Sequence, residues 1–78
     1  MDWQTFIGSD DRILGGKPAL KGTRLSVEFL LERLANGWSV QDLYDNYPAL
    51  TPAHVQAMFA FVNEMLTDTH FLPARQAA

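Results

Sequence analysis

The segment that decides the fold is Gly15-Gly16-Lys17-Pro18-Ala19-Leu20-Lys21-Gly22-Thr23-Arg24-Leu25-Ser26, directly before an apolar helical pattern. It holds three of the five glycines and three of the six basic side chains of the chain. Glycine lets a backbone turn tightly or approach a partner closely. The cations lie together in a chain whose net charge is −3. We therefore expect a turn-rich, cationic arm that leads into a small helical body.

Two short extended pieces are expected in this arm. Residues 12–14 precede the turn at residues 15–16, and residues 19–20 lead to a second turn at residues 21–22. Glycine pairs between short apolar runs are typical of a β-hairpin. Pro18 has no amide hydrogen and excludes a central, fully bonded strand here, so we expect any strand in this part of the arm to be an edge strand.

The first two helices are predicted from apolar spacing and capping residues. Ser26 is a suitable N-cap, and glycine after residue 36 is a suitable C-terminal stop. A helical face follows Ser26 at the spacing i, i+3, i+4 and i+7, comprising Val27, Leu30, Leu31 and Leu34. Ser39 and Asp42 have the spacing of a capping box for a second, short helix. That helix ends before Pro48, because the residue preceding proline avoids the helical region.

A third helix is predicted to begin with Thr51 as its cap and Pro52 in its first turn, where proline loses no hydrogen bond. It is expected to fray at residues 67–69. We expect its buried stripe to comprise Val55, Met58, Phe59, Val62, Met65 and Leu66. Three helices with a short middle member predict a helix-turn-helix-like trihelical bundle, in which the third helix would be the recognition helix.

The fold class is therefore mainly α, with a short N-terminal β-hairpin before the trihelical bundle. The 78 residues suit a single domain, with a lead segment and hairpin arm at 1–25, a trihelical core at 26–68 and a tail at 69–78. Such a small core is marginal on its own, so we expect a homodimer. Cysteine is absent and His54 and His70 stand sixteen residues apart, so no metal site and no cofactor are expected. The sequence shows no membrane span and no signal peptide, so we expect a cytoplasmic protein.

Three stretches of the sequence resemble a known bacterial family. They are residues 15–27, Leu-Ala-Asn-Gly-Trp-Ser-Val-Gln-Asp-Leu at 34–43, and Tyr-Pro-Ala-Leu-Thr-Pro-Ala-His-Val at 47–55. Together they resemble the domain-of-unknown-function family 433 over roughly residues 7 to 65. The resemblance implies a small protein of the helix-turn-helix class. Several members are encoded beside PIN-domain ribonuclease toxins and are interpreted as antitoxins, so it also implies a DNA-binding or toxin-neutralising role.

The nucleic-acid hypothesis uses the arm. Lys17, Lys21 and Arg24 would contact the phosphates of an operator, and Gln56 and His54 would reach base edges. The alternative is a purely structural hairpin, whose glycines serve turn geometry. The third helix has no lysine or arginine, so DNA contact would depend on the arm or on two copies of it.

The protein-interaction hypothesis uses apolar residues outside the helical stripes. Large aromatic side chains are enriched at the centres of interfaces, although a small domain can also tuck them under its lead segment. The candidate interface residues are Trp3, Phe6, Phe29, Trp38, Phe61, Phe71 and Leu72.

These observations leave two functions open. The first is an antitoxin-like, DNA-binding regulatory module of a toxin–antitoxin system, with a PIN-domain-type toxin as the expected partner. The alternative is a protein-interaction adaptor without nucleic-acid contact. Enzyme activity is not expected, because no nucleophile, base and orienting group can be assigned.

Overall fold

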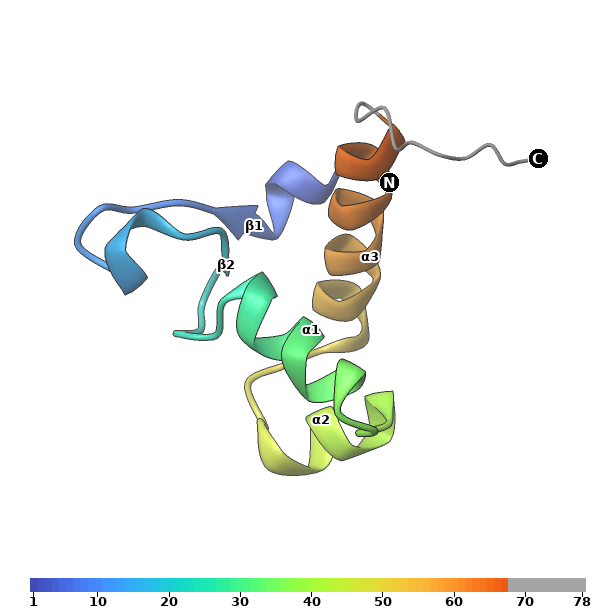
Figure 1. Cartoon of the computed structure of the whole chain (residues 1–78). Coiled ribbons are helices and arrows are strands. Elements are labelled where there is room, and N and C mark those ends of the chain that lie inside the picture. The colour runs from blue at the N-terminus through green and yellow to red at the C-terminus, as the bar shows by residue number, and fades with distance from the viewer. Residues whose placement is uncertain (68–78) are drawn as a thin grey trace.

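The computed structural model describes residues 1–67 (Figure 1). As predicted, a two-stranded hairpin precedes three helices. The elements in chain order are the 3₁₀ helix η1 (Trp3–Thr5), strand β1 (Ile7–Gly8), the 3₁₀ turn η2 (Leu14–Gly16), strand β2 (Ala19–Leu20), and helices α1 (Val27–Ala35), α2 (Val40–Asn46) and α3 (Pro52–Thr67).

The hairpin differs from the expected one in its first strand. β2 forms at residues 19–20 as predicted, but its antiparallel partner is β1, with Ile7 opposite Leu20. The prediction of an extended strand at residues 12–14 was wrong, because Arg12 lies in a turn, Ile13 forms only an isolated bridge with Asp10, and Leu14 begins the turn η2. Leu14 has a φ of 54°, and the two glycines after it have φ of 65° and 85°. A left-handed backbone of this kind cannot continue a strand.

β2 also has a neighbour on its other side. The amide of Leu20 donates to the carbonyl of Leu25 at 2.9 Å, and Ala19 forms a bridge with Ser26. The strand therefore lies between two backbone segments. Pro18 is tolerated because it precedes the strand, where no ladder hydrogen bond requires its amide.

Local capping sets the helix boundaries as the sequence predicts. The Ser26 hydroxyl accepts the amide hydrogen of Phe29 at 2.9 Å. Ser39 and Asp42 form a reciprocal capping box at the start of α2. α1 is followed by Gly37, whose φ of 98° is a left-handed conformation that glycine adopts at low cost.

The hairpin and the helices share one hydrophobic cluster. Ile7 of β1 and Leu20 of β2 are buried with α1, α2 and α3, and Leu30, Leu43 and Met58 have no exposed surface. The base of the hairpin is therefore part of the core. The connection between β1 and β2 extends away from the helices, and the segment between β2 and α1 projects on the same side (Figure 1).

The predicted buried stripe of α3 is only partly correct. Val55 and Met58 are buried, but Phe59, Met65 and Leu66 are 46%, 41% and 64% exposed. α3 has 16 residues and α1 has nine, so at 1.5 Å per residue α3 is too long for α1 to cover. The C-terminal turns of α3 meet η1 on one side and leave apolar surface uncovered elsewhere.

Among residues 1–67, no helix has the length and hydrophobicity required to cross a membrane. Phe71 and Leu72, two of the predicted interface residues, lie outside the described residues.

Candidate functional site

Lys17 of the hairpin forms an ion pair with the first turn of α1. Its Nζ lies 2.6 Å from Oε1 of Glu28. The hydrogen bond, followed by the Coulombic attraction, raises the pKa of Lys17 and lowers the pKa of Glu28. The two side chains are 59% and 72% exposed, and such surface pairs contribute little stability. The pair nevertheless neutralises one of the cations expected to face phosphate.

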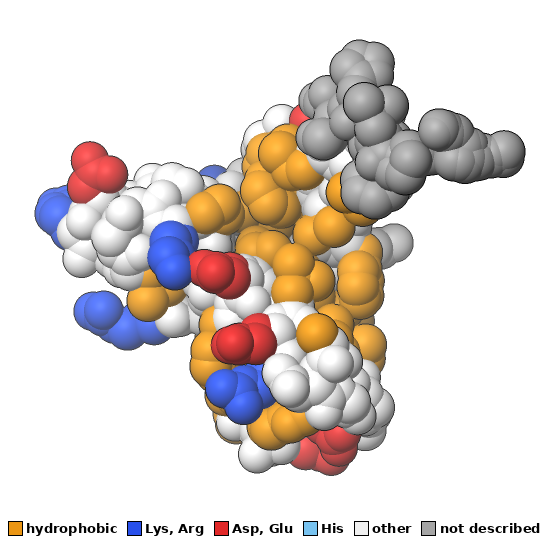
Figure 2. All heavy atoms as spheres, in the orientation of Figure 1, with side chains coloured by type: hydrophobic (Ala, Val, Ile, Leu, Met, Phe, Trp, Pro, Cys, Tyr) orange, Lys and Arg blue, Asp and Glu red, His pale blue; other side chains and the backbone are white. Residues whose placement is uncertain are grey.

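The other basic side chains of the hairpin do not form a common cluster. Lys21 donates from Nζ to the carbonyl of Gln4 at 2.9 Å. Arg12 pairs with Asp10 at 3.1 Å, and hydrogen bonds from Arg12 lower the pKa of that carboxyl. Figure 2 accordingly shows the cations of this face as separate patches and not as one basic surface. Among the described residues, Arg24 is the predicted phosphate contact whose side chain has no partner.

His54 links α3 to the hairpin. Its Nδ1 accepts the amide hydrogen of Thr51 at 3.1 Å, and its Nε2 lies 2.9 Å from the carbonyl of Lys21. A neutral ring with its proton on Nε2 satisfies both contacts. The amide of His54 also donates to the Thr51 hydroxyl, which confirms Thr51 as the cap of α3. With both ring nitrogens occupied, His54 is a structural link between two elements, and base reading would require that link to break.

The outward stripe of α3 contains no cation. Pro52, Gln56, Phe59 and Asn63 are exposed along it. Gln56 is therefore accessible, as the nucleic-acid hypothesis requires. Its nearest neighbours along the stripe are a proline and a phenylalanine, which do not contact phosphates. Gln56 therefore lies on α3 without a cation of that helix beside it to hold a phosphate.

Most of the predicted interface aromatics are packed inside the domain. Trp3, Phe6, Phe29, Trp38 and Phe61 all rest half-buried against the core.

Ring contacts within the domain account for part of this burial. The rings of Trp3 and Phe61 meet edge to face with centroids 4.8 Å apart. The indole nitrogen of Trp3 donates to Glu64 at 2.9 Å. Trp38 stacks on Tyr47 with centroids 6.2 Å apart. Their first role is thus to anchor η1 and the helix connections, as the structural alternative proposed.

The exposed apolar surface lies instead between α1 and α3. A hollow of about 330 Å³, here called the α1–α3 groove, has walls that are almost entirely apolar. Figure 2 shows apolar side chains running continuously along this part of the molecule. Of the predicted interface residues, Phe61 contributes to it. The groove is lined by Pro18, Val27, Glu28, Leu31, Phe61, Val62, Met65 and Leu66.

The apolar spacing of α3 could not reveal this groove, because Met65 and Leu66 have the same periodicity as core residues. The available signal was the difference in length between the helices. Helix α3 has 16 residues, whereas α1 and α2 have nine and seven, so neither of them alone can cover its whole length.

A family model matches the part of the chain that contains the three stretches on which the resemblance rests. The family model described as "Protein of unknown function (DUF433)" matches residues 7–62. No curated protein matches the chain, and no solved structure matches it.

Proposed function

This chain belongs to the DUF433 family of proteins of unknown function, and on that premise we propose that it is an antitoxin-like adaptor. In this proposal a basic amphipathic helix of a protein partner binds in the α1–α3 groove. The observation that carries the proposal is the groove itself, with Leu66 64% exposed beside it. The proposal assigns the chain no catalytic step.

The shape and chemistry of the groove suit a helix. Amphipathic helices bind by laying an apolar face into a groove between two helices of the receptor. Leu31 from α1 and Val62 and Leu66 from α3 form opposite walls. Fully covering an exposed leucine contributes about 1.5–3 kcal/mol, so a few such contacts provide a useful affinity.

The net charge of the helical part of the chain favours a basic partner. Between residues 25 and 67 the sequence has five carboxylates and a single cation, Arg33. The resemblance supplies ribonuclease toxins as the class of partner, and a protein that holds RNA phosphates needs cations. Complementary charge of this kind steers association and favours the correct partner. The five carboxylates are Glu28, Glu32, Asp42, Asp45 and Glu64.

The test is co-purification with the protein encoded by the adjacent gene, followed by calorimetric titration. Leu66→Asp places a charge in the groove and should weaken binding by about 30-fold, as expected for the loss of an interface hot spot. Asn63→Asp is the matched control. It adds the same charge to an exposed position of α3 outside the groove, and it should bind as the parent protein does.

Two outcomes contradict this proposal. Equal binding by the Leu66→Asp and Asn63→Asp variants would show that the groove is not the contact surface. The second outcome is that the parent protein does not bind the adjacent gene product, while sedimentation equilibrium shows that the Leu66→Asp substitution dissociates a homodimer. In that case the groove holds a second copy of this chain, and the adaptor proposal is wrong.

DNA binding through the hairpin is the second candidate, and Arg24 is the observation that favours it. Its guanidinium is exposed and lacks a partner among residues 1–67. An electrophoretic shift with the DNA upstream of the chain's own gene tests this candidate. Neutralising Lys17, Lys21 and Arg24 together should abolish the shift and reduce its dependence on salt. An unchanged shift would reject the hairpin as the DNA contact.

A further inference from the structure

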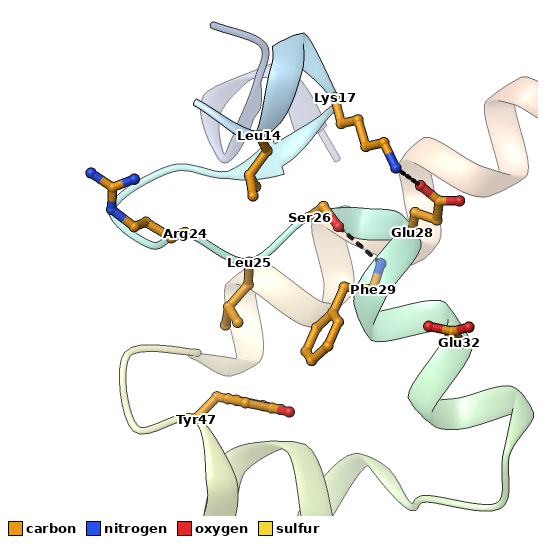
Figure 3. A pocket seen from close by; sticks show the side chains of 9 residues that line it. All are labelled: Leu14, Lys17, Arg24, Leu25, Ser26, Glu28, Phe29, Glu32 and Tyr47. Atoms are coloured by element: carbon orange, nitrogen blue, oxygen red, sulfur yellow. Dashed lines mark hydrogen bonds and ion pairs between the residues drawn. The ribbon is translucent and has the colours of Figure 1, made fainter. Parts of the chain in front are cut away.

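A second hollow, of about 480 Å³, shares only Glu28 with the α1–α3 groove. This volume is within the range of sites that hold small ligands or a few side chains of a peptide. Its walls come from three separate parts of the chain, namely the hairpin, the first two turns of α1 and the C-terminal end of α2 (Figure 3). We call it the hairpin hollow.

The interior of the hairpin hollow is apolar and aromatic. Leu14, Leu25 and Phe29 point into the same space, with the ring of Tyr47 beneath them (Figure 3). The rings of Phe29 and Tyr47 meet edge to face with centroids 5.7 Å apart. This packing fixes the two rings and provides a rigid surface for an inserted side chain.

Leu14 has an unfavourable backbone conformation at the mouth of this hollow. Its φ of 54° makes it the single non-glycine residue with a positive φ among residues 1–67. A residue with a Cβ adopts this region at a cost, and Leu14 gains little burial in return because it is 41% exposed. Strain of this kind is concentrated at binding sites. A contact between the Leu14 side chain and a ligand would explain why this position holds a leucine and not a glycine.

Opposite charges stand at the two ends of the hairpin hollow. Arg24 lies at one edge and Glu32 at the opposite edge (Figure 3). Neither side chain has a hydrogen-bond or ion-pair partner in the described part of the chain. Lys17 and Glu28, also at the rim, neutralise each other. Glu32 also contributes a weaker Coulombic attraction to Lys17. Arg24 and Glu32 at opposite edges thus favour a ligand that is acidic at one end and basic at the other.

We propose that the hairpin hollow binds an extended peptide segment of a protein partner. The segment has a large apolar residue between an acidic and a basic one. The apolar side chain packs on Leu25, Phe29 and Tyr47 beneath Leu14. The carboxylate receives hydrogen bonds from Arg24, whose planar guanidinium suits a carboxylate, and the cation faces Glu32. This site lies outside the α1–α3 groove, so either proposal can fail without the other.

The probe is acetyl-Asp-Gly-Phe-Gly-Lys-amide, in which the glycines let the charges adjust their spacing. Its binding to the ¹⁵N-labelled protein is followed by amide chemical shifts. We expect a dissociation constant of about 1 mM, with shifts that centre on residues 14, 24–25, 29 and 47. The neutral peptide acetyl-Asn-Gly-Phe-Gly-Gln-amide should bind about tenfold more weakly, since charge-assisted hydrogen bonds are the stronger ones.

Three variants assign the interaction. Arg24→Gln should weaken binding by about tenfold, and Leu14→Gly by about threefold while it relieves the strained backbone. Arg12→Gln is the control, because Arg12 is an exposed hairpin cation, paired with Asp10, that does not line the hollow. It should leave the affinity unchanged.

The proposal is overturned if 5 mM peptide leaves the amides of the hollow unmoved. It is also overturned if Arg24→Gln and Arg12→Gln reduce the affinity equally, since that result would indicate only a general attraction to positive charge. Unchanged affinity in the Leu14→Gly variant would remove the contact assigned to Leu14 and, with it, the argument from backbone strain.

Discussion

Replacing Leu30 by alanine tests the assignment of the core most directly. Leu30 lies in α1 with no exposed surface, so its truncation loses apolar burial and leaves a cavity. Leucine-to-alanine changes at such sites cost about 2–5 kcal/mol. A domain of this length has a total free energy of unfolding of about 4–12 kcal/mol. The variant should therefore lose a large part of its stability.

Urea denaturation followed by circular dichroism measures the effect. With an m-value of about 1 kcal/mol/M for so small a protein, a loss of about 3 kcal/mol lowers the midpoint by about 3 M. Leu66→Ala is the matched control, because it removes the same atoms from a leucine that is 64% exposed. Surface substitutions of this kind usually change stability by less than about 0.5 kcal/mol.

Equal midpoint shifts for the two variants would refute the assignment of Leu30 to the core and of Leu66 to the exposed groove. Both variants should be measured at two protein concentrations, since association through the groove would make the stability of the parent protein concentration-dependent. A loss in the Leu66→Ala variant that grows with protein concentration would locate Leu66 in a contact between copies.

Three further changes test local features. Gly37→Ala should lower the free energy of unfolding by about 1 kcal/mol or more in urea denaturation, because φ at this position is 98° and a residue with a Cβ adopts that region at a cost. No atom lies within 4 Å of the added Cβ, so a steric clash would not account for the loss. An unchanged midpoint would contradict this expectation. His54→Ala should cost about 1–3 kcal/mol, since it leaves the carbonyl of Lys21 without its partner, and a neutral result would show that water replaces the link. Lys17→Gln should raise the pKa of Glu28 towards its ordinary 4.5, as measured by NMR titration. In the parent protein, the contribution of the pair is lost as pH falls through the lowered pKa of Glu28 and as pH rises through the raised pKa of Lys17.

Helix boundaries could be predicted from the sequence because capping is local. Ser26 and Ser39 each bond to an amide three residues away, and Gly37 needs only its own backbone freedom. Local capping therefore explains where these helices begin and end. It does not explain which segment pairs with β2, since β1 lies about twelve residues before it and competes with residues 12–14, which are nearer.

The surface of this protein was decided by tertiary structure. Lys17 meets Glu28 eleven residues away, and His54 meets the carbonyl of Lys21 thirty-three residues away, so a cationic segment in the sequence did not become a cationic surface. Periodicity predicted that Leu66 is buried, and this was wrong because the lengths and placement of the three helices determine which apolar residues are covered. Helical periodicity describes one helix at a time, whereas burial depends on what packs against it.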